Sequence, residues 1–235
     1  MRGDRLAIIA DCAPAGADAP ALAVRAVGCV PYPEALALQE QLLAAAIAHE
    51  ASDQLLLVEH PPVYTLGRGA DAADLRGAPE RLGVPVYRVG RGGGATFHGP
   101  GQLVAYPIVH LRAAGRDVHR YVRGLETALI ATCTHFGVAA AAPAGQTGVW
   151  TARGKIASIG IGVRRAVAYH GVALNVSTDL SFFAHIVPCR SSGLAVTSLA
   201  EMLGAAPPLS EVGRVFAERL AATLGCAGVE FGATA

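Results

Sequence analysis

The twelve residues from Arg91 to Gln102, RGGGATFHGPGQ, constrain this chain more than any other stretch. Six of them are glycine or proline, which the interiors of helices and sheets disfavour. Strand-like runs flank them, Val84–Val89 before and Leu103–Val109 after. The backbone here must therefore adopt special dihedral angles or let another group approach it closely. We interpret the segment as a loop that forms one wall of a binding site. Its side chains suited to recognition are Arg91, Thr96, His98 and Gln102.

Two other interpretations of this loop are open. Glycine-rich loops are commonest as simple turns, and a lone histidine beside Gly-Pro is more often structural than catalytic. A phosphate-binding loop is less favoured, because the segment has no Gly-Lys-Ser/Thr ending and a strand follows it where nucleotide-binding motifs need a helix N-terminus.

The bulk composition narrows the class of protein. Of the 235 residues, 52% are hydrophobic and 16% charged, so the chain can bury a sizeable core. A net charge of +1 gives no reason to expect nucleic acid or a membrane surface as a partner. The five cysteines are scattered and contain no CxxC pair, so we expect reduced thiols and no metal site. No apolar stretch is long enough to span a bilayer, and a cytoplasmic location is expected.

The periodicity of apolar residues predicts the order of elements. Strands are expected at Leu22–Val27, Leu55–Glu59, Ile156–Val163 and Val167–Val176. Helices are expected over Glu34–His49 and Val118–Phe136, after Ser198 in a capping box with Glu201, and after a Ser210 cap. Hairpin connections without a tandem βα repeat indicate an α+β fold. We expect one domain over residues 21–235 and a flexible N-terminal extension over residues 1–20.

We expect the helix over Glu34–His49 to have only a structural role. Its Leu36, Leu43 and Ile47 can share one buried face, and we assign it no function.

Two residues depart from ordinary patterns. Cys189 follows Pro188 in an irregular stretch, whereas Cys133 falls on a helical core stripe. Lys155 precedes a strand of alanine, isoleucine and glycine. A thiol attacks only as thiolate, from an ordinary pKa of about 8.5, and a nearby lysine would lower that pKa. A buried, inert cysteine and a solvated lysine are the alternatives, and sequence separation does not show whether the two meet.

Five segments of the chain resemble the motifs of the lipoyl(octanoyl) transferases, the octanoyl-[acyl-carrier-protein]:protein transferases of lipoate synthesis. They are Arg91–Gln102, His60–Arg68 (HPPVYTLGR), Gly154–Gly160 (GKIASIG), His170–Asn175 (HGVALN) and Ile186–Cys189 (IVPC). The segments occur in the family's order, between about residues 25 and 225.

The resemblance implies a biotin/lipoate protein ligase-like α+β fold, with mixed β-sheets flanked by helices. It also implies a Cys–Lys dyad, with Cys189 as acyl-thioester nucleophile and Lys155 as the group that lowers its pKa, and no cofactor. The implied substrate-binding residues are Arg91, Gly92, Gly93, Gly94, Ala95, Thr96, Phe97, His98, Ser158, Ile159, Gly160, Gly171, Val172 and Ala173.

The implied activity moves an octanoyl group from octanoyl-acyl carrier protein to a lysine ε-amine. The acceptors would be lipoyl domains of 2-oxoacid dehydrogenase complexes and the glycine cleavage H protein. No nucleic-acid or membrane partner is implied, and a monomer is expected. The alternatives are an ATP-dependent lipoate or biotin ligase on the same fold and a non-catalytic acyl-binding protein.

Chain selectivity would come from a dry slot lined by small residues such as Gly93, Gly94, Ala95 and Gly160. At about 0.8 kcal/mol per methylene, seven methylenes supply at most about 5 kcal/mol. Such a slot discriminates poorly against one carbon more or less.

Two residues depart from the family's pattern. Phe97 stands where the family usually has tyrosine, which would remove a hydroxyl from the pocket wall. Arg190 stands where a glycine usually follows the nucleophile, which adds a positive charge or, at a positive φ, strain.

Overall fold

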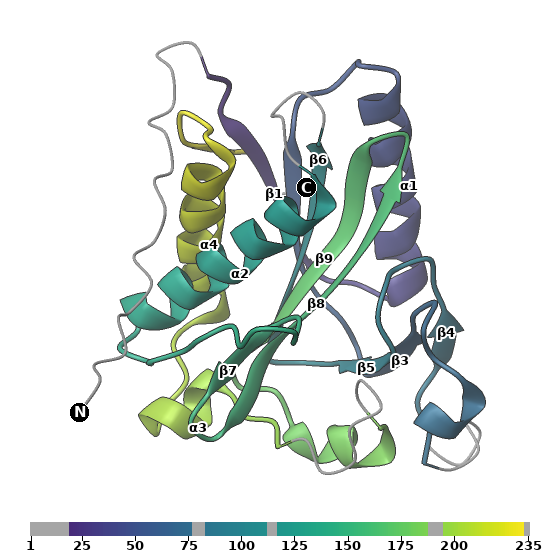
Figure 1. The fold of residues 1–235 in the computed structure, drawn as a ribbon, viewed down its shortest axis with the longest axis vertical. Coiled ribbons are helices and arrows are strands. Elements are labelled where there is room, and N and C mark those ends of the chain that lie inside the picture. The colour runs from purple at the N-terminus through teal and green to yellow at the C-terminus, as the bar shows by residue number, and fades with distance from the viewer. Residues whose placement is uncertain (1–18, 77–82, 112–116, 188–194, 233–235) are drawn as a thin grey trace.

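The structure is a computed structural model that describes residues 19–76, 83–111, 117–187 and 195–232. A seven-stranded mixed sheet has the order β10-β1-β2-β6-β9-β8-β7 (Figure 1). Its strands are β1 (Leu22–Cys29), β2 (Gln54–Glu59), β6 (Gln102–His110), β7 (Val149–Thr151), β8 (Gly154–Arg164), β9 (Val167–Asn175) and β10 (Val229–Phe231). Strand β1 pairs in parallel with β2 and β10, and the other neighbours are antiparallel. A smaller sheet, of order β4-β3-β5, contains β3 (Val63–Leu66), β4 (Val86–Arg88) and β5 (Ala95–His98).

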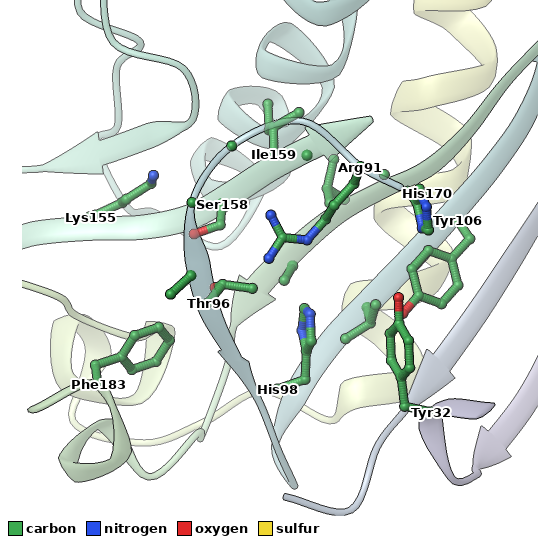
Figure 2. A pocket seen from close by; sticks show the side chains of 18 of the residues that line it. Tyr32, Arg91, Thr96, His98, Tyr106, Lys155, Ser158, Ile159, His170 and Phe183 are labelled. Atoms are coloured by element: carbon green, nitrogen blue, oxygen red, sulfur yellow. The ribbon is translucent and has the colours of Figure 1, made fainter. Parts of the chain in front are cut away.

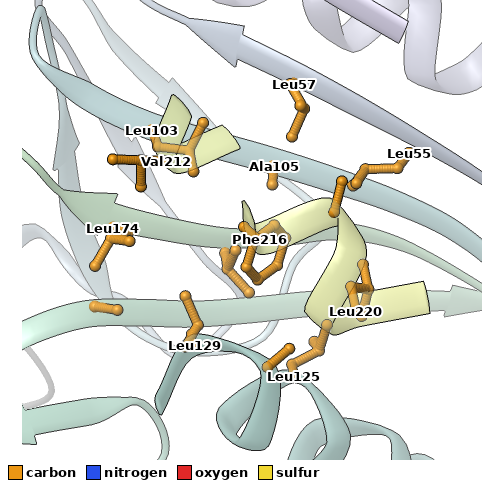
Figure 3. Packing of buried hydrophobic residues seen from close by; sticks show 14 of the residues in the cluster. Leu55, Leu57, Leu103, Ala105, Leu125, Leu129, Leu174, Val212, Phe216 and Leu220 are labelled. Carbon is orange, nitrogen blue, oxygen red and sulfur yellow. The ribbon is translucent and has the colours of Figure 1, made fainter. Parts of the chain in front are cut away.

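Helices cover both faces of the large sheet. Helix α1 (Tyr32–Ile47) packs on one face, and α2 (Val118–His135) and α4 (Leu209–Leu224) pack on the other. The short elements are α3 (Leu199–Leu203) and the 3₁₀ segments η1 (Ala72–Asp74) and η4 (Leu180–His185). In the main core, Phe216 and Leu220 of α4 meet Leu125 and Leu129 of α2 against the sheet (Figure 3). The expected α+β class, with mixed sheets flanked by helices, is confirmed.

Local sequence signals explain where the helices begin and end. Asp117 caps α2 by accepting a hydrogen bond from the Arg120 amide, and Gly137 follows the helix at φ +80°. Ser198 caps α3 as predicted, but the Glu201 carboxylate accepts from the Thr197 hydroxyl instead of completing a capping box. The Ser210 cap is wrong, because α4 begins at Leu209 after Pro208 and has no side-chain cap.

Two further expectations need correction. The segment 91–102 is not all loop, because Ala95–His98 forms β5 and pairs with β3. Helix α1 buries Tyr32, Ala35, Gln39, Leu43 and Ala46, whereas Leu36 and Ile47 are only half-buried. Residues 1–18 of the expected extension lie outside the described residues. Within the described part of the chain, no helix is both long and apolar enough to cross a membrane.

Candidate active site

A cleft lies between the small sheet and strands β8 and β9 of the large sheet (Figure 2). Its empty space is about 690 Å³, open solvent at its mouth included, which matches the size of a small-molecule site. Twelve of the fourteen predicted substrate-binding residues line it, together with Lys155. The twelve are Arg91, Gly93, Gly94, Ala95, Thr96, His98, Ser158, Ile159, Gly160, Gly171, Val172 and Ala173.

The other two predicted residues lie elsewhere. Gly92 lines a second, adjoining cleft, and its amide donates a hydrogen bond to the Ile161 carbonyl (2.8 Å). Phe97 is 1% exposed, and its ring stacks on Phe182 with centroids 4.5 Å apart. The expectation that Phe97 forms part of the pocket wall is therefore wrong, because its ring packs in an aromatic cluster behind that wall.

Arg91 crosses the middle of the cleft and is held by the small sheet (Figure 2). Its Nη2 donates to the carbonyl (2.7 Å) and hydroxyl (2.8 Å) of Thr65, and its Nη1 donates to the Gly92 carbonyl (3.0 Å). The loop lies so close to β3 that a Cβ on Gly67 would be 2.4 Å from the Gly93 carbonyl oxygen. Glycine at 67 therefore allows the approach that buries the guanidinium.

His98 belongs to a buried hydrogen-bond network. Its Nδ1 donates to Gln102 Oε1 (2.8 Å), and Gln102 Nε2 donates to Asn175 Oδ1 (2.9 Å). Asn175 in turn donates to the Thr197 carbonyl (3.0 Å), and the Thr197 amide donates to the Lys155 carbonyl (3.0 Å). Burial, with smaller contributions from nearby histidine and arginine charges, lowers the pKa of His98 to about 3. His98 is therefore neutral near pH 7 and serves to position neighbours rather than to carry a proton.

The buried histidines predict acid sensitivity. Burial, then the charge of Arg91, lowers the pKa of His170 to about 4. Both folded-state pKa values lie below the unfolded value of about 6.5, so the unfolded chain binds more protons at acid pH. Stability should therefore be full above pH 6.5 and fall toward pH 3, by up to about 1.4 kcal/mol per pH unit for each histidine.

Urea unfolding at pH 7, 5.5 and 4.5 measures this dependence. His170→Asn should show a shallower loss than the wild type, whereas His135→Asn, at an exposed site at the end of α2, should leave the slope unchanged. Equal slopes in all three proteins would contradict the role given to His170.

The side chain of Lys155 packs against Trp150 and Gly148 at one end of the cleft. It is 6% exposed, and its Nζ lies 4.9 Å from the centre of the Trp150 ring. A Cβ on Gly148 would be 2.8 Å from its Cε, and the Gly148 amide donates to Glu126 Oε1 (3.1 Å). Lys155 is also the only lysine among the 19 basic residues of the sequence. A lysine amine exchanges protons where an arginine stays charged, so composition alone singles out Lys155.

Cys189 and Arg190 lie outside the described residues, so the predicted dyad stays a prediction. Described residues that precede and follow Cys189 in the sequence nevertheless line this cleft. Phe183 before it and Val196 after it both line the cleft, and the Lys155 amide donates to the Ala195 carbonyl (2.9 Å).

None of the described cysteines lines the cleft. Cys133 lies in the core between α2 and the sheet, where burial raises the pKa of its thiol to about 12. A thiol in that state is inert near neutral pH.

The cleft also contains residues that sequence reasoning missed. Those with large side chains are Tyr32, Tyr106, His170 and Phe183. His170 precedes a predicted contact residue, but only its surroundings show that it faces the cleft.

A second cleft shares Gly93, Lys155, Ile159 and Gly160 with the first and continues past the 145–147 segment. Among its other lining residues are Val122, Gln146, Thr147 and Trp150. Lys155 thus lies where the two clefts meet.

Comparisons with known proteins show the family and the fold of this chain. Residues 31–221 match the model of the lipoyl protein ligase A/B catalytic domain. An octanoyltransferase of Geobacter metallireducens is 49% identical over 199 residues, which cover 83% of this chain and 90% of that protein.

Solved structures share the fold at low sequence identity. The bipartite lipoate protein ligase of Thermoplasma acidophilum, studied with its E2 lipoyl domain, superposes with a TM-score of 0.70 at 18% identity, covering 91% of this chain and 86% of that one. The biotin protein ligase of Aquifex aeolicus, in complex with biotin and ATP, gives 0.53 at 13% identity, covering 86% and 70%. The expected biotin/lipoate ligase-like fold is confirmed.

Proposed function

The chain belongs to the lipoyl protein ligase A/B catalytic domain family, and we propose that within it the protein is an octanoyltransferase. It transfers an octanoyl group from acyl carrier protein to a lysine of a lipoyl domain. The observation that carries the proposal is the buried Lys155 at the junction of two clefts, one of them lined by twelve residues of the family's motifs.

The reaction proceeds through two acyl transfers. The Cys189 thiolate attacks the donor's thioester carbonyl, a new C–S bond forms, and the carrier's thiol leaves with a proton. The neutral ε-amine of the acceptor lysine then attacks the enzyme thioester, an amide forms, and the Cys189 sulfur leaves as the thiol after the amine's proton is transferred to it. The positive charge of Lys155 favours the thiolate and lowers the thiol's pKa. Backbone N–H groups of the glycine-rich wall stabilise the tetrahedral oxyanion.

The two clefts suit a substrate that has two arms. A thioester whose carbonyl lies at Lys155 extends its acyl chain in one direction and its thiol arm in the other. We assign the octanoyl chain to the cleft under Arg91 and the carrier's arm to the second cleft. The acceptor lysine enters by the same second cleft after the carrier has left. Trp150, Gln146 and Thr147 offer that arm an aromatic face and polar groups.

Intact-mass analysis after mixing with octanoyl-carrier protein tests the proposal. The wild type should gain one octanoyl group without ATP, hydroxylamine should remove it as it removes thioesters, and Cys189→Ala should gain none. Because Lys155 is the only lysine, a hydroxylamine-stable amide on a side chain would map to that residue, and peptide mapping distinguishes it from acylation of the α-amino group. An adduct that requires ATP would favour the ligase alternative. Binding of octanoate without any adduct would favour the non-catalytic one.

A further inference from the structure

Three buried polar atoms of His170, which lines the acyl cleft, and of its neighbour Gln39, which does not, have no hydrogen-bond partner among the described residues. They are His170 Nδ1, His170 Nε2 and Gln39 Nε2. His170 is 2% exposed and lines the cleft, and Gln39 of α1 is fully buried. The two residues are joined, since the His170 amide donates to Gln39 Oε1 (3.2 Å).

This arrangement distinguishes His170 from the other buried histidines. His60 bonds Val30 and Tyr106 through its two ring nitrogens, and His98 bonds Gln102 and Thr65. A buried imidazole with two unpaired nitrogens is unusual, because such groups are almost always satisfied. Its pKa of about 4 keeps the ring neutral, with one donor and one acceptor.

The backbone at His170 is unusual as well. Its φ is +58°, which non-glycine residues rarely adopt, and it lies within strand β9 rather than in a turn. The β6–β9 ladder pairs Ala105 with Val172 and Val109 with Ala168, and Pro107, which has no N–H, lies between these pairs on β6. Strain of this kind persists where the surroundings enforce it, and it is concentrated at functional sites.

The position of His170 places it at the end of the cleft opposite Lys155. Figure 2 shows the two residues on opposite sides of Arg91, with Tyr106 and Tyr32 near His170. The sheet register agrees, because His170 pairs with Ile161, six residues along β8 from Lys155. An acyl chain whose carbonyl is at Lys155 therefore points its methyl end toward His170.

We propose that His170, held from outside the cleft by Gln39, forms a polar end wall that sets the upper limit on acyl-chain length. This inference rests on the proposed function. In a slot of small residues, each added methylene raises the affinity for the acyl chain about fourfold, so the slot alone sets no upper limit on chain length. A chain that presses against His170 leaves its unpaired nitrogens no room to gain a water or any other partner, at a cost of roughly 5- to 150-fold for each group. The cost of reaching the wall therefore exceeds the gain from one further methylene.

A pair of substrates of equal length separates polarity from size. Nonanoyl and 8-hydroxyoctanoyl chains have the same number of heavy atoms, and only the second can bond the wall at its end. We define the hydroxyl preference as the rate of 8-hydroxyoctanoyl transfer divided by that of nonanoyl transfer, both from carrier protein. His170→Gly removes the imidazole and tolerates the positive φ, whereas His170→Asn also tolerates it and keeps a polar group. His49→Gly is the matched control, because His49 has φ +60° and lies exposed after α1.

The wild type and His49→Gly should show a hydroxyl preference at least about tenfold higher than that of His170→Gly, with His170→Asn between them. His170→Gly should also accept decanoyl relative to octanoyl at least about tenfold better than the wild type. An equal hydroxyl preference in the wild type and His170→Gly would overturn the polar wall. A change in decanoyl acceptance alone would also overturn it, because a purely steric stop predicts that result.

Calorimetry with the free octanoic, nonanoic and 8-hydroxyoctanoic acids makes the same comparison without turnover. In one outcome, the wild type transfers no octanoyl group, but its binding selectivity among the three acids still depends on His170. That outcome would contradict the proposed function and support the wall. Transfer by the wild type with no dependence of selectivity on His170 would contradict the wall and leave the proposed function standing.

Discussion

Replacing Lys155 with methionine should reduce octanoyl transfer at pH 7 by about 10²- to 10⁴-fold while the protein stays folded. Methionine matches the length of the lysine stem and fits the apolar cradle of Trp150 and Gly148. In the proposed mechanism, the variant loses the positive charge that favours the Cys189 thiolate. Alkylation of Cys189 should therefore be slow near neutral pH and recover partly as the pH rises toward the ordinary thiol pKa of about 8.5. Peptide mass mapping after timed alkylation between pH 6 and 9 measures this recovery.

Two controls sharpen this experiment. Cys29 is exposed and lies away from both clefts, so its alkylation in the same digest should not depend on residue 155. Lys155→Arg keeps a positive charge but not an exchangeable proton, so it separates thiolate stabilisation from proton transfer. If Cys189 reacts at wild-type rates in Lys155→Met across the whole pH range, the two residues are not a pair.

Much of the fold could be predicted because it depends on local patterns. Helix α2 follows a run of apolar residues at spacings of three and four, and Gly137 follows its end; Gly225 follows α4 in the same way, and both glycines have a positive φ. The buried face of α1 could not be predicted in the same way. A glutamine in a helical pattern is normally assigned to the solvent side, yet Gln39 is buried because the His170 amide, far away in sequence, donates to it.

The sequence predicted only those residues of the site that belong to contiguous motifs. Side chains alternate along a strand, so β5 directs Thr96 and His98 to the cleft and the ring of Phe97 to the aromatic cluster. The importance of His170 depends on which nitrogens lack partners, and that is set by residues from other elements. The position of Cys189 relative to Lys155 stays a prediction.

Replacing Gly67 with alanine should lower octanoyl transfer by about 10²-fold and the free energy of unfolding by about 1–3 kcal/mol. The new Cβ would lie 2.4 Å from the Gly93 carbonyl oxygen, 2.9 Å from that of Gly92 and 2.8 Å from Arg91 Nη1. Two of these atoms belong to the backbone, so no side-chain rotation relieves the clash. The glycine-rich loop must move away from β3. Arg91 is then no longer placed to donate its hydrogen bonds to Thr65.

Gly228→Ala is the matched control for Gly67→Ala. A Cβ at Gly228 meets nothing within 4 Å and its φ is not positive, so this change should keep full activity and leave stability equal or up to about 1 kcal/mol higher. Transfer rates and urea unfolding of both variants give the comparison. Loss of activity in Gly67→Ala should appear mainly in kcat for octanoyl-carrier protein, because in the proposed mechanism the displaced wall holds the reacting carbonyl and not the carrier. Wild-type kcat in a folded Gly67→Ala protein would show that the contact between the loop and β3 does not position the substrate.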